Sequence, residues 1–199
     1  MNLPNKLTTG RFGLTVLFVW ALFFTPFRFH NTLALLLFNI ASFTDFLDGK
    51  IARSRGLITN FGILMDSLAD KILICSAFIA FVESSNVNPH AQVKVAAWMV
   101  IIIVAREFAI TGMRLLAASK SIVLAAENFG KHKTVSQIAA INALLLLDAC
   151  QEWPLASQQF IQKWLPPFAD LMLWLAVILT ATSGALYLWR NRALYLNDM

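Results

Sequence analysis

Charged residues are scarce in this sequence of 199 residues. Asp, Glu, Lys and Arg together make up 14%, against about 25% in typical soluble domains. Hydrophobic residues make up 58%, and the mean hydropathy is +0.66. So much apolar surface is expected to face lipid. We therefore expect an integral membrane protein, folded as a single membrane domain over residues 1–199.

Cysteine and histidine are also sparse. Cys75 and Cys150 lie in apolar segments without a ligand-like spacing, and His30, His90 and His132 are scattered. The sequence therefore predicts neither a disulfide framework nor a zinc site. No small-residue cleavage site follows the first apolar run, so this run is interpreted as a retained span and not as a secretory signal.

Basic residues exceed acidic ones, giving a formal net charge of +5, but they are dispersed between apolar segments. Because they form no stripe on a soluble face, we expect no nucleic-acid partner. Anionic membrane lipids or a phosphorylated substrate fit this charge better.

Six apolar windows can be placed as crossings of a hydrocarbon core of about 30 Å, of which the first and the fifth are short. They cover residues 12–26, 32–53, 62–84, 92–118, 134–150 and 167–189. Eleven of the sixteen Lys and Arg residues lie near span ends on one side, which is therefore expected to be cytoplasmic. The sequence thus predicts an all-α polytopic membrane protein with six transmembrane helices and both termini in the cytoplasm. Residues 1–11 are expected to form either an interfacial helix or a frayed terminus.

Four aspartates interrupt the second and third spans. A carboxylate at membrane depth costs about 2.5–3.5 kcal/mol on insertion scales, so a cluster of four would oppose folding unless it is neutralised. At helical spacing, Asp45 and Asp48 share one face, and so do Asp66 and Asp70. The short linker after Arg53 is expected to bring the two helices into antiparallel contact. We therefore expect the four carboxylates to converge near the cytoplasmic mouth.

Carboxylates in this number suit hard divalent cations. Their oxygens and summed charge fit two Mg²⁺ or Mn²⁺ ions, which commonly occur together where phosphate oxygens are handled. Gly49, Ala52 and Gly62 leave room for a ligand against the main chain, and Arg53 offers a guanidinium to a diphosphate oxygen. The alternatives are surface acids of a soluble bundle, or structural pairing with nearby Lys and Arg. The membrane composition and the shared facing disfavour both.

The segment DFLDGKIAR at 45–53, followed eight residues later by GILMDSLAD at 62–70, resembles the signature of the CDP-alcohol phosphatidyltransferases. The resemblance implies a six-helix membrane enzyme in which an acceptor hydroxyl displaces CMP from a CDP-linked lipid or alcohol. It implies that Asp45, Asp48 and Asp66 bind two metal ions, with Asp66 bridging them. Asp70 is then the general base and a further metal ligand. The residues that the resemblance places at the CDP-lipid are Asp48, Gly49, Ala52, Arg53, Gly62 and Asp66.

A second basic group indicates the acceptor. Arg106 lies too deep in the fourth span to reach the interface, and Arg114 lies on nearly the same helical face. Glu107 faces about 100° away from Arg106, so we expect it to be an imperfect partner. Guanidinium groups at this depth favour the phosphate of a phosphorylated alcohol. The residues predicted to bind that phosphate are Arg106, Arg114, Lys131, Lys133 and Thr134, and for Lys131 a position at the cytoplasmic interface is the alternative.

The pieces MNLPNKLTTGR, AREFAITGMR and GKHKTVSQ resemble the bacterial branch of the family that makes phosphatidylglycerophosphate. This implies CDP-diacylglycerol and glycerol 3-phosphate as substrates, a homodimer, and a location in the cell inner (cytoplasmic) membrane with the active site facing the cytoplasm. Inositol phosphate, serine and phosphatidylglycerol stay open as acceptors. A divalent-cation channel or transporter would also use four carboxylates. It would not explain a buried Arg106 or the spacing of the small residues around the acids.

Overall fold

The computed structural model is all-helical in the parts of the chain that it describes. The described backbone covers residues 3–23, 27–55, 60–87, 92–120, 129–192 and 194, and its side chains are described except at 3–7, 46–55, 60–64, 66, 87, 129–132 and 156–157. Six helices and no strand occur in these ranges. The helices are α1 (Leu3–Phe23), α2 (His30–Arg55), α3 (Asn60–Val87), α4 (Ala97–Ser119), α5 (Phe129–Cys150) and α6 (Leu155–Arg190).

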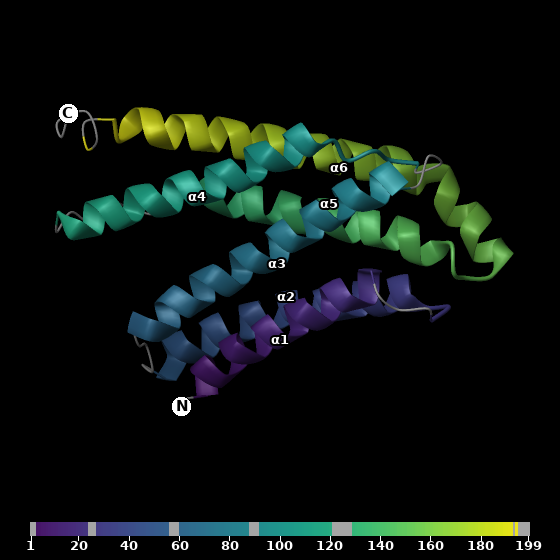
Figure 1. Ribbon diagram of the computed structural model, residues 1–199, viewed down its shortest axis with the longest axis horizontal. Coiled ribbons are helices and arrows are strands. Elements are labelled where there is room, and N and C mark those ends of the chain that lie inside the picture. Colours follow the sequence, from purple (N-terminus) through teal and green to yellow (C-terminus); the bar gives the residue numbers. More distant parts are fainter. Residues whose placement is uncertain are drawn as a thin grey trace.

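The six helices run lengthwise in one bundle, and α1 begins at the end of the bundle where α6 ends (Figure 1). α1 packs against α2 and α3, and α5 packs against α2 and, most extensively, α6. α4 lies against α3 and α6. The expected antiparallel arrangement of α2 and α3 is present, and α1 packs against both helices.

The core of the bundle combines aromatic rings with alanines. Phe18 and Phe38 are fully buried, with ring centroids 5.7 Å apart. Fully buried alanines allow close approach of helix backbones, as in other membrane helix bundles. These alanines are Ala21, Ala34, Ala41, Ala69, Ala77, Ala140, Ala149, Ala169 and Ala176. Small residues at the contacts therefore let the helices that carry the polar groups pack closely.

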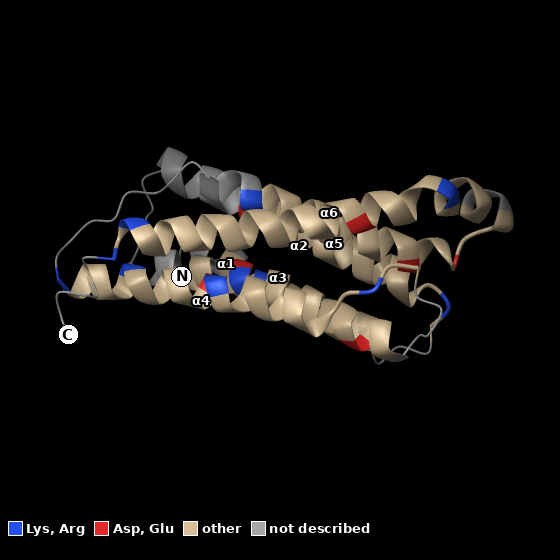
Figure 2. Cartoon of the chain, turned by 90° about the horizontal axis from the view of Figure 1, so that it is seen from above, with Lys and Arg blue, Asp and Glu red and all other residues tan. Residues whose placement is uncertain are grey.

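The outer surface of the bundle is rich in large apolar side chains, which is the expected pattern for a protein that faces lipid. Examples are Val16, Ile101, Phe108, Phe160 and Ile178, each more than half exposed. Charged residues are few and lie mostly toward the helix ends, apart from a group of both signs inside the bundle (Figure 2).

Two described stretches, Lys133–Cys150 and Gln158–Arg190, qualify as membrane spans by length and hydropathy, and Thr8–Phe23 is a shorter apolar helix. α2, α3 and α4, which carry the aspartates and Arg106, do not qualify over their described residues. An all-helical fold with membrane-compatible helices is therefore established. The six crossings stay a prediction.

The first and last helices begin earlier than the sequence predicts. α1 begins at Leu3, so residues 3–11, expected as an interfacial or frayed segment, continue the first apolar helix. α6 begins at Leu155 instead of residue 167 and includes Pro166 and Pro167. Proline removes a backbone hydrogen bond and crowds the preceding turn, so it bends a helix, and α6 bends in its first part (Figure 1). In this first part of α6, Leu165 is buried in the core and Ile161 packs against the core.

Glu152, in the connection between α5 and α6, caps the start of α2. Its carboxylate accepts hydrogen bonds from the backbone N–H groups of Asn31, at 2.7 Å, and Thr32, at 3.0 Å. It also accepts one from the Thr32 hydroxyl, at 2.7 Å, and Trp153 Nε1 donates to that hydroxyl. An anion at a helix N-terminus satisfies open donors and opposes the positive end of the helix dipole. The cap fixes α2 against the α5–α6 connection.

Replacing Glu152 by alanine is expected to lower the free energy of unfolding by about 1–3 kcal/mol, because several backbone and hydroxyl donors lose a charged acceptor. The melting temperature of the protein in detergent should fall accordingly. The matched control is Glu83→Ala, since Glu83 is exposed at the end of α3. Equal melting temperatures for the two variants would show that the cap does not stabilise the fold.

Candidate active site

The four aspartates all lie in helices, as the sequence predicts. Asp45 and Asp48 are one turn apart in α2, and Asp66 and Asp70 are one turn apart in α3. The side chains of Asp45 and Asp70 are described, and these two lie within electrostatic reach of each other. The side chains of Asp48 and Asp66 lie outside the described residues, so the convergence of all four carboxylates stays a prediction.

A buried arginine of α1 contacts this site. Arg11 Nη1 donates to Asp45 Oδ1 at 2.6 Å, and the Arg11 side chain is fully buried whereas that of Asp45 is 39% exposed. The guanidinium balances part of the negative charge that the carboxylates would otherwise place in an apolar bundle. The sequence predicts a first span from residue 12, which makes Arg11 only an interfacial cation. Because α1 begins at Leu3, Arg11 instead lies two turns inside the helix.

The donor set fits a divalent cation. Asp45 and Asp70 bring carboxylate oxygens from two different helices, and such hard donors are the ligands of Mg²⁺ and Mn²⁺. Among the described side chains, no group of three His, Cys, Asp or Glu residues could hold a metal ion, and Asp48 and Asp66 are not among those side chains. The described half of the predicted set is therefore compatible with a metal site.

A second group of charges, formed by Arg106, Glu107 and Lys133, joins α4 to α5. Glu107 Oε1 accepts hydrogen bonds from Lys133 Nζ and from Arg106 Nη1, the latter at 3.3 Å. Glu107 is 8% exposed and Lys133 is 6% exposed. Glu107 reaches both cations, and Arg106 is the more distant of the two, as expected for an imperfect partner. Two cations around one carboxylate leave a net positive charge in a nearly buried place.

Helix α6 closes this charged group from the other side. Arg106 Nη2 donates to the Ser183 hydroxyl at 3.4 Å, and the hydroxyl of Tyr187, one turn further on, is buried. Gln137, one turn after Lys133, donates to the Thr180 hydroxyl at 3.0 Å and so ties α5 to α6 at this depth. The sequence indicates no role for α6 in the site, since neither serine nor threonine in an apolar span is a specific signal.

The other predicted acceptor residues differ in placement. Arg114 is exposed but lies within electrostatic reach of Arg106. Thr134 is half-buried beside Lys133, and the side chain of Lys131 lies outside the described residues. The carboxylate and cation groups are neighbours, because Asp70 is within electrostatic reach of Lys133 and Glu107. The structure therefore brings Arg106 and Lys133 together at Glu107 and places Asp70 within electrostatic reach of Lys133, whereas phosphate binding by these residues stays a prediction.

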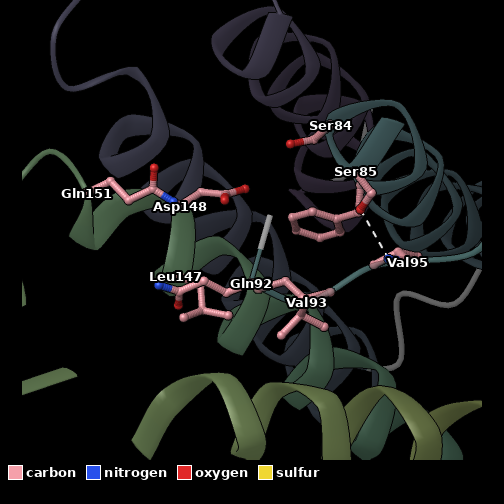
Figure 3. A pocket seen from close by; sticks show the side chains of 10 residues that line it. Ser84, Ser85, Gln92, Val93, Val95, Leu147, Asp148 and Gln151 are labelled. Atoms are coloured by element: carbon pink, nitrogen blue, oxygen red, sulfur yellow. Dashed lines mark hydrogen bonds between the residues drawn. The ribbon is translucent and has the colours of Figure 1, made fainter. Parts of the chain in front are cut away.

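Two cavities lined by described residues lie at the opposite end of the bundle. A cavity of about 170 Å³ is lined by residues that include His30, Asp148 and Gln151. A smaller one of about 30 Å³ shares Ser84 and Asp148 with it, and there the Ser84 hydroxyl and the Asp148 carboxylate point toward each other (Figure 3). Ser84 lies about 21 Å along α3 from Asp70 at 1.5 Å per residue. These cavities are therefore separate from the charged groups described above.

Taken together, these features define a class: helical membrane proteins whose apolar bundle encloses neighbouring acidic and basic groups. Within that class, the chain belongs to the CDP-alcohol phosphatidyltransferase family, whose model matches residues 1–182. The resemblance carried by residues 45–70 is thus confirmed.

Several curated relatives have similar sequences over nearly their full length. The chain is 41% identical to a Bacillus subtilis protein over 96% of this chain and 95% of the relative. It is 32% identical to a Rickettsia felis protein, over 94% and 93% of the two chains, and 31% identical to a Haemophilus influenzae protein, over 94% and 91%. All three relatives are named CDP-diacylglycerol--glycerol-3-phosphate 3-phosphatidyltransferase.

Proposed function

We propose that this chain transfers the phosphatidyl group of CDP-diacylglycerol to glycerol 3-phosphate, giving phosphatidylglycerophosphate and CMP. The observation that carries the proposal is the nearly buried, net positive group of Arg106, Glu107 and Lys133 within electrostatic reach of Asp70. An acceptor that bears a phosphate can bind there and present its hydroxyl to the carboxylates. The names of the relatives support the same pair of substrates.

The metal ligands of the proposed site are Asp45, Asp48, Asp66 and Asp70, which would hold two Mg²⁺ or Mn²⁺ ions. When bound, such ions neutralise the diphosphate and make CMP a better leaving group. Residues proposed for the CDP-lipid are Asp48, Gly49, Ala52, Arg53, Gly62 and Asp66. Asp66 is the proposed bridging ligand of the two ions.

The reaction is a displacement at the phosphatidyl phosphorus. Arg106 and Lys133 hold the acceptor phosphate, and Asp70 accepts the proton of the attacking hydroxyl. A bond forms between the hydroxyl oxygen and the phosphatidyl phosphorus, while the bond from that phosphorus to the bridging oxygen of CMP breaks. Arg114, Lys131 and Thr134 complete the proposed phosphate site at its cytoplasmic side.

The proposed setting is the bacterial inner membrane, with six crossings, a homodimeric assembly and the active site facing the cytoplasm. The arrangement of the helix ends supports an even number of crossings, because α1 begins where α6 ends (Figure 1). Arg11, Asp45, Asp70 and Lys133 lie in the halves of their helices that are nearer to this end of the bundle. The excess of Lys and Arg on this side supports its cytoplasmic orientation.

The proposed function is tested with purified protein in detergent micelles containing CDP-diacylglycerol, by following CMP release with each of several acceptors. Release is expected with glycerol 3-phosphate and not with serine, inositol phosphate or phosphatidylglycerol at equal concentration. Adding EDTA should abolish it, and added Mg²⁺ or Mn²⁺ should restore it. Faster release with another acceptor would overturn the choice of glycerol 3-phosphate, and turnover insensitive to EDTA would reject the metal ligands.

Replacing Arg106 by alanine is expected to raise the KM for glycerol 3-phosphate by roughly 10–100-fold, because a charge-assisted hydrogen bond to phosphate is lost. The KM for CDP-diacylglycerol should change little. Steady-state kinetics with each substrate varied in turn measure both values. Arg28→Ala is the control, since Arg28 is exposed at the opposite end of the bundle. A larger effect on the KM for CDP-diacylglycerol would remove Arg106 from the acceptor site.

A further inference from the structure

Gly184 in α6 lies directly against the side chain of Arg106. A Cβ atom at Gly184 would lie 2.6 Å from Arg106 Cγ, 3.6 Å from its Cβ and 3.8 Å from its Cδ. Carbon atoms in van der Waals contact are about 3.5–4.0 Å apart, so the first distance excludes any side chain at residue 184. Arg106 Cγ is close to the main chain and can move away only if the whole side chain changes its rotamer. Because Gly184 has no side chain, Arg106 can adopt the observed side-chain conformation against α6.

The neighbouring residue Ser183 holds the far end of the same side chain. Its hydroxyl accepts a hydrogen bond from Arg106 Nη2, while Nη1 is held by Glu107. The aliphatic stem lies against α6 at Gly184, and the guanidinium is held by contacts from α4 and α6. The side chain of Arg106, a residue of α4, is thus held along its whole length by contacts from α4 and α6.

These contacts leave the Nε–H donor of Arg106 unused. Within the described part of the chain, the buried Nε of Arg106 has no hydrogen-bond partner, whereas Nη1 and Nη2 have partners. A buried donor without an acceptor is unfavourable, and an oxygen of a phosphate monoester would satisfy it. A rotamer change forced by a side chain at Gly184 would turn this donor away from its present direction.

We propose that Ser183 and Gly184 of α6 position the Arg106 guanidinium for the phosphate of the acceptor. Gly184 leaves space for the aliphatic part of the Arg106 side chain, and the Ser183 hydroxyl holds the guanidinium through Nη2. This inference rests on the proposed function, since it assumes that Arg106 binds the phosphate of glycerol 3-phosphate. Both are positioning residues, because they act through Arg106 and not on the substrate. They set the affinity for the phosphorylated acceptor and leave that for the CDP-lipid unchanged.

The variant Gly184→Ala is expected to raise the KM for glycerol 3-phosphate about tenfold, with kcat and the KM for CDP-diacylglycerol changed less than twofold. Ser183→Ala should raise the same KM severalfold. The matched control is Gly112→Ala, which makes the same substitution in α4 where a Cβ would meet nothing within 4 Å. It should leave all kinetic constants at their wild-type values.

A double-mutant cycle separates positioning from a merely structural effect. In an Arg106→Ala background, adding Gly184→Ala or Ser183→Ala should leave the KM for glycerol 3-phosphate unchanged, since the group that they position is gone. An equal rise in KM with and without Arg106 would overturn the inference.

If Gly184→Ala does not fold, the Ser183→Ala variant is the test, and an unchanged KM for glycerol 3-phosphate in that variant overturns the inference. If the wild type releases no CMP with glycerol 3-phosphate, the proposed function fails first; if it does and both variants match Gly112→Ala, only this inference fails.

Discussion

Asp70→Asn is expected to lower kcat by a factor of about 10² to 10⁴, the usual contribution of a positioned general base. Asparagine has the shape of aspartate but cannot accept the proton of the attacking hydroxyl. Asp70 lies within electrostatic reach of both Asp45 and Lys133, so the acceptor hydroxyl would be presented between the carboxylates and the cation that holds its phosphate. The melting temperature should stay near its wild-type value, and the affinity for Mn²⁺ should fall less than in a variant of the proposed bridging ligand Asp66, since Asp70 is proposed to act chiefly as the base.

The comparison that gives this result its meaning is Asp66→Asn. Asp66 lies one turn before Asp70 in α3 and is the proposed bridging ligand of the two ions. Its amide variant is expected to lose both turnover and metal affinity, because an amide oxygen carries no charge to balance the cations. Titration of each variant with Mn²⁺, followed by electron paramagnetic resonance, measures the affinity apart from activity. Equal Mn²⁺ affinities in the two variants would contradict the separate roles.

The second large effect is expected from Arg11→Met. This substitution should lower the stability of the fold by an amount that depends on whether a divalent cation is bound. In EDTA, the variant should lose about 3 kcal/mol of stability, the low end for breaking a buried ion pair, because Asp45 keeps some exposure to solvent. Saturating Mg²⁺ should narrow the difference from the wild type, since a bound cation supplies the charge that the guanidinium supplied. Thermal unfolding in detergent, with EDTA or with Mg²⁺, measures both differences.

Arg28→Met is the control for this experiment. Arg28 is exposed, and its replacement should change the melting temperature little under either condition. If the Arg11→Met variant is destabilised equally with EDTA and with Mg²⁺, Arg11 and the metal do not share Asp45. Arg11 would then be a structural counter-ion that is independent of the metal site.

The helices and the pairing of acidic residues were predictable from the sequence, because both follow from local spacing. Apolar windows indicate helices, and Asp45 with Asp48, or Asp66 with Asp70, share a helix face at i+3 or i+4. Membership of the family was also predictable, because the signature that indicates it is contained in 26 consecutive positions, residues 45–70.

The partners of these groups were not predictable, because they come from helices far away in the sequence. Arg11 reaches Asp45 from α1, and the contact depends on a helix that begins nine residues before the predicted span. Gly184 and Ser183 meet Arg106 across the packing of α4 against α6, 77 positions apart in the case of Ser183. Helical periodicity shows which way a residue faces on its own helix, but not what another helix places opposite it.

The proposed site depends on carboxylates of α2 and α3 that would hold divalent cations inside an apolar bundle. The most direct test is a crystal structure with Mn²⁺ and CDP-diacylglycerol, in which anomalous scattering locates the ions. Two anomalous peaks are expected within ligand distance, about 2.0–2.3 Å, of the oxygens of Asp45, Asp48, Asp66 and Asp70, with Asp66 between them. The absence of peaks there at saturating Mn²⁺, with the four carboxylates pointing to separate surfaces, would contradict the metal site and the proposed chemistry with it.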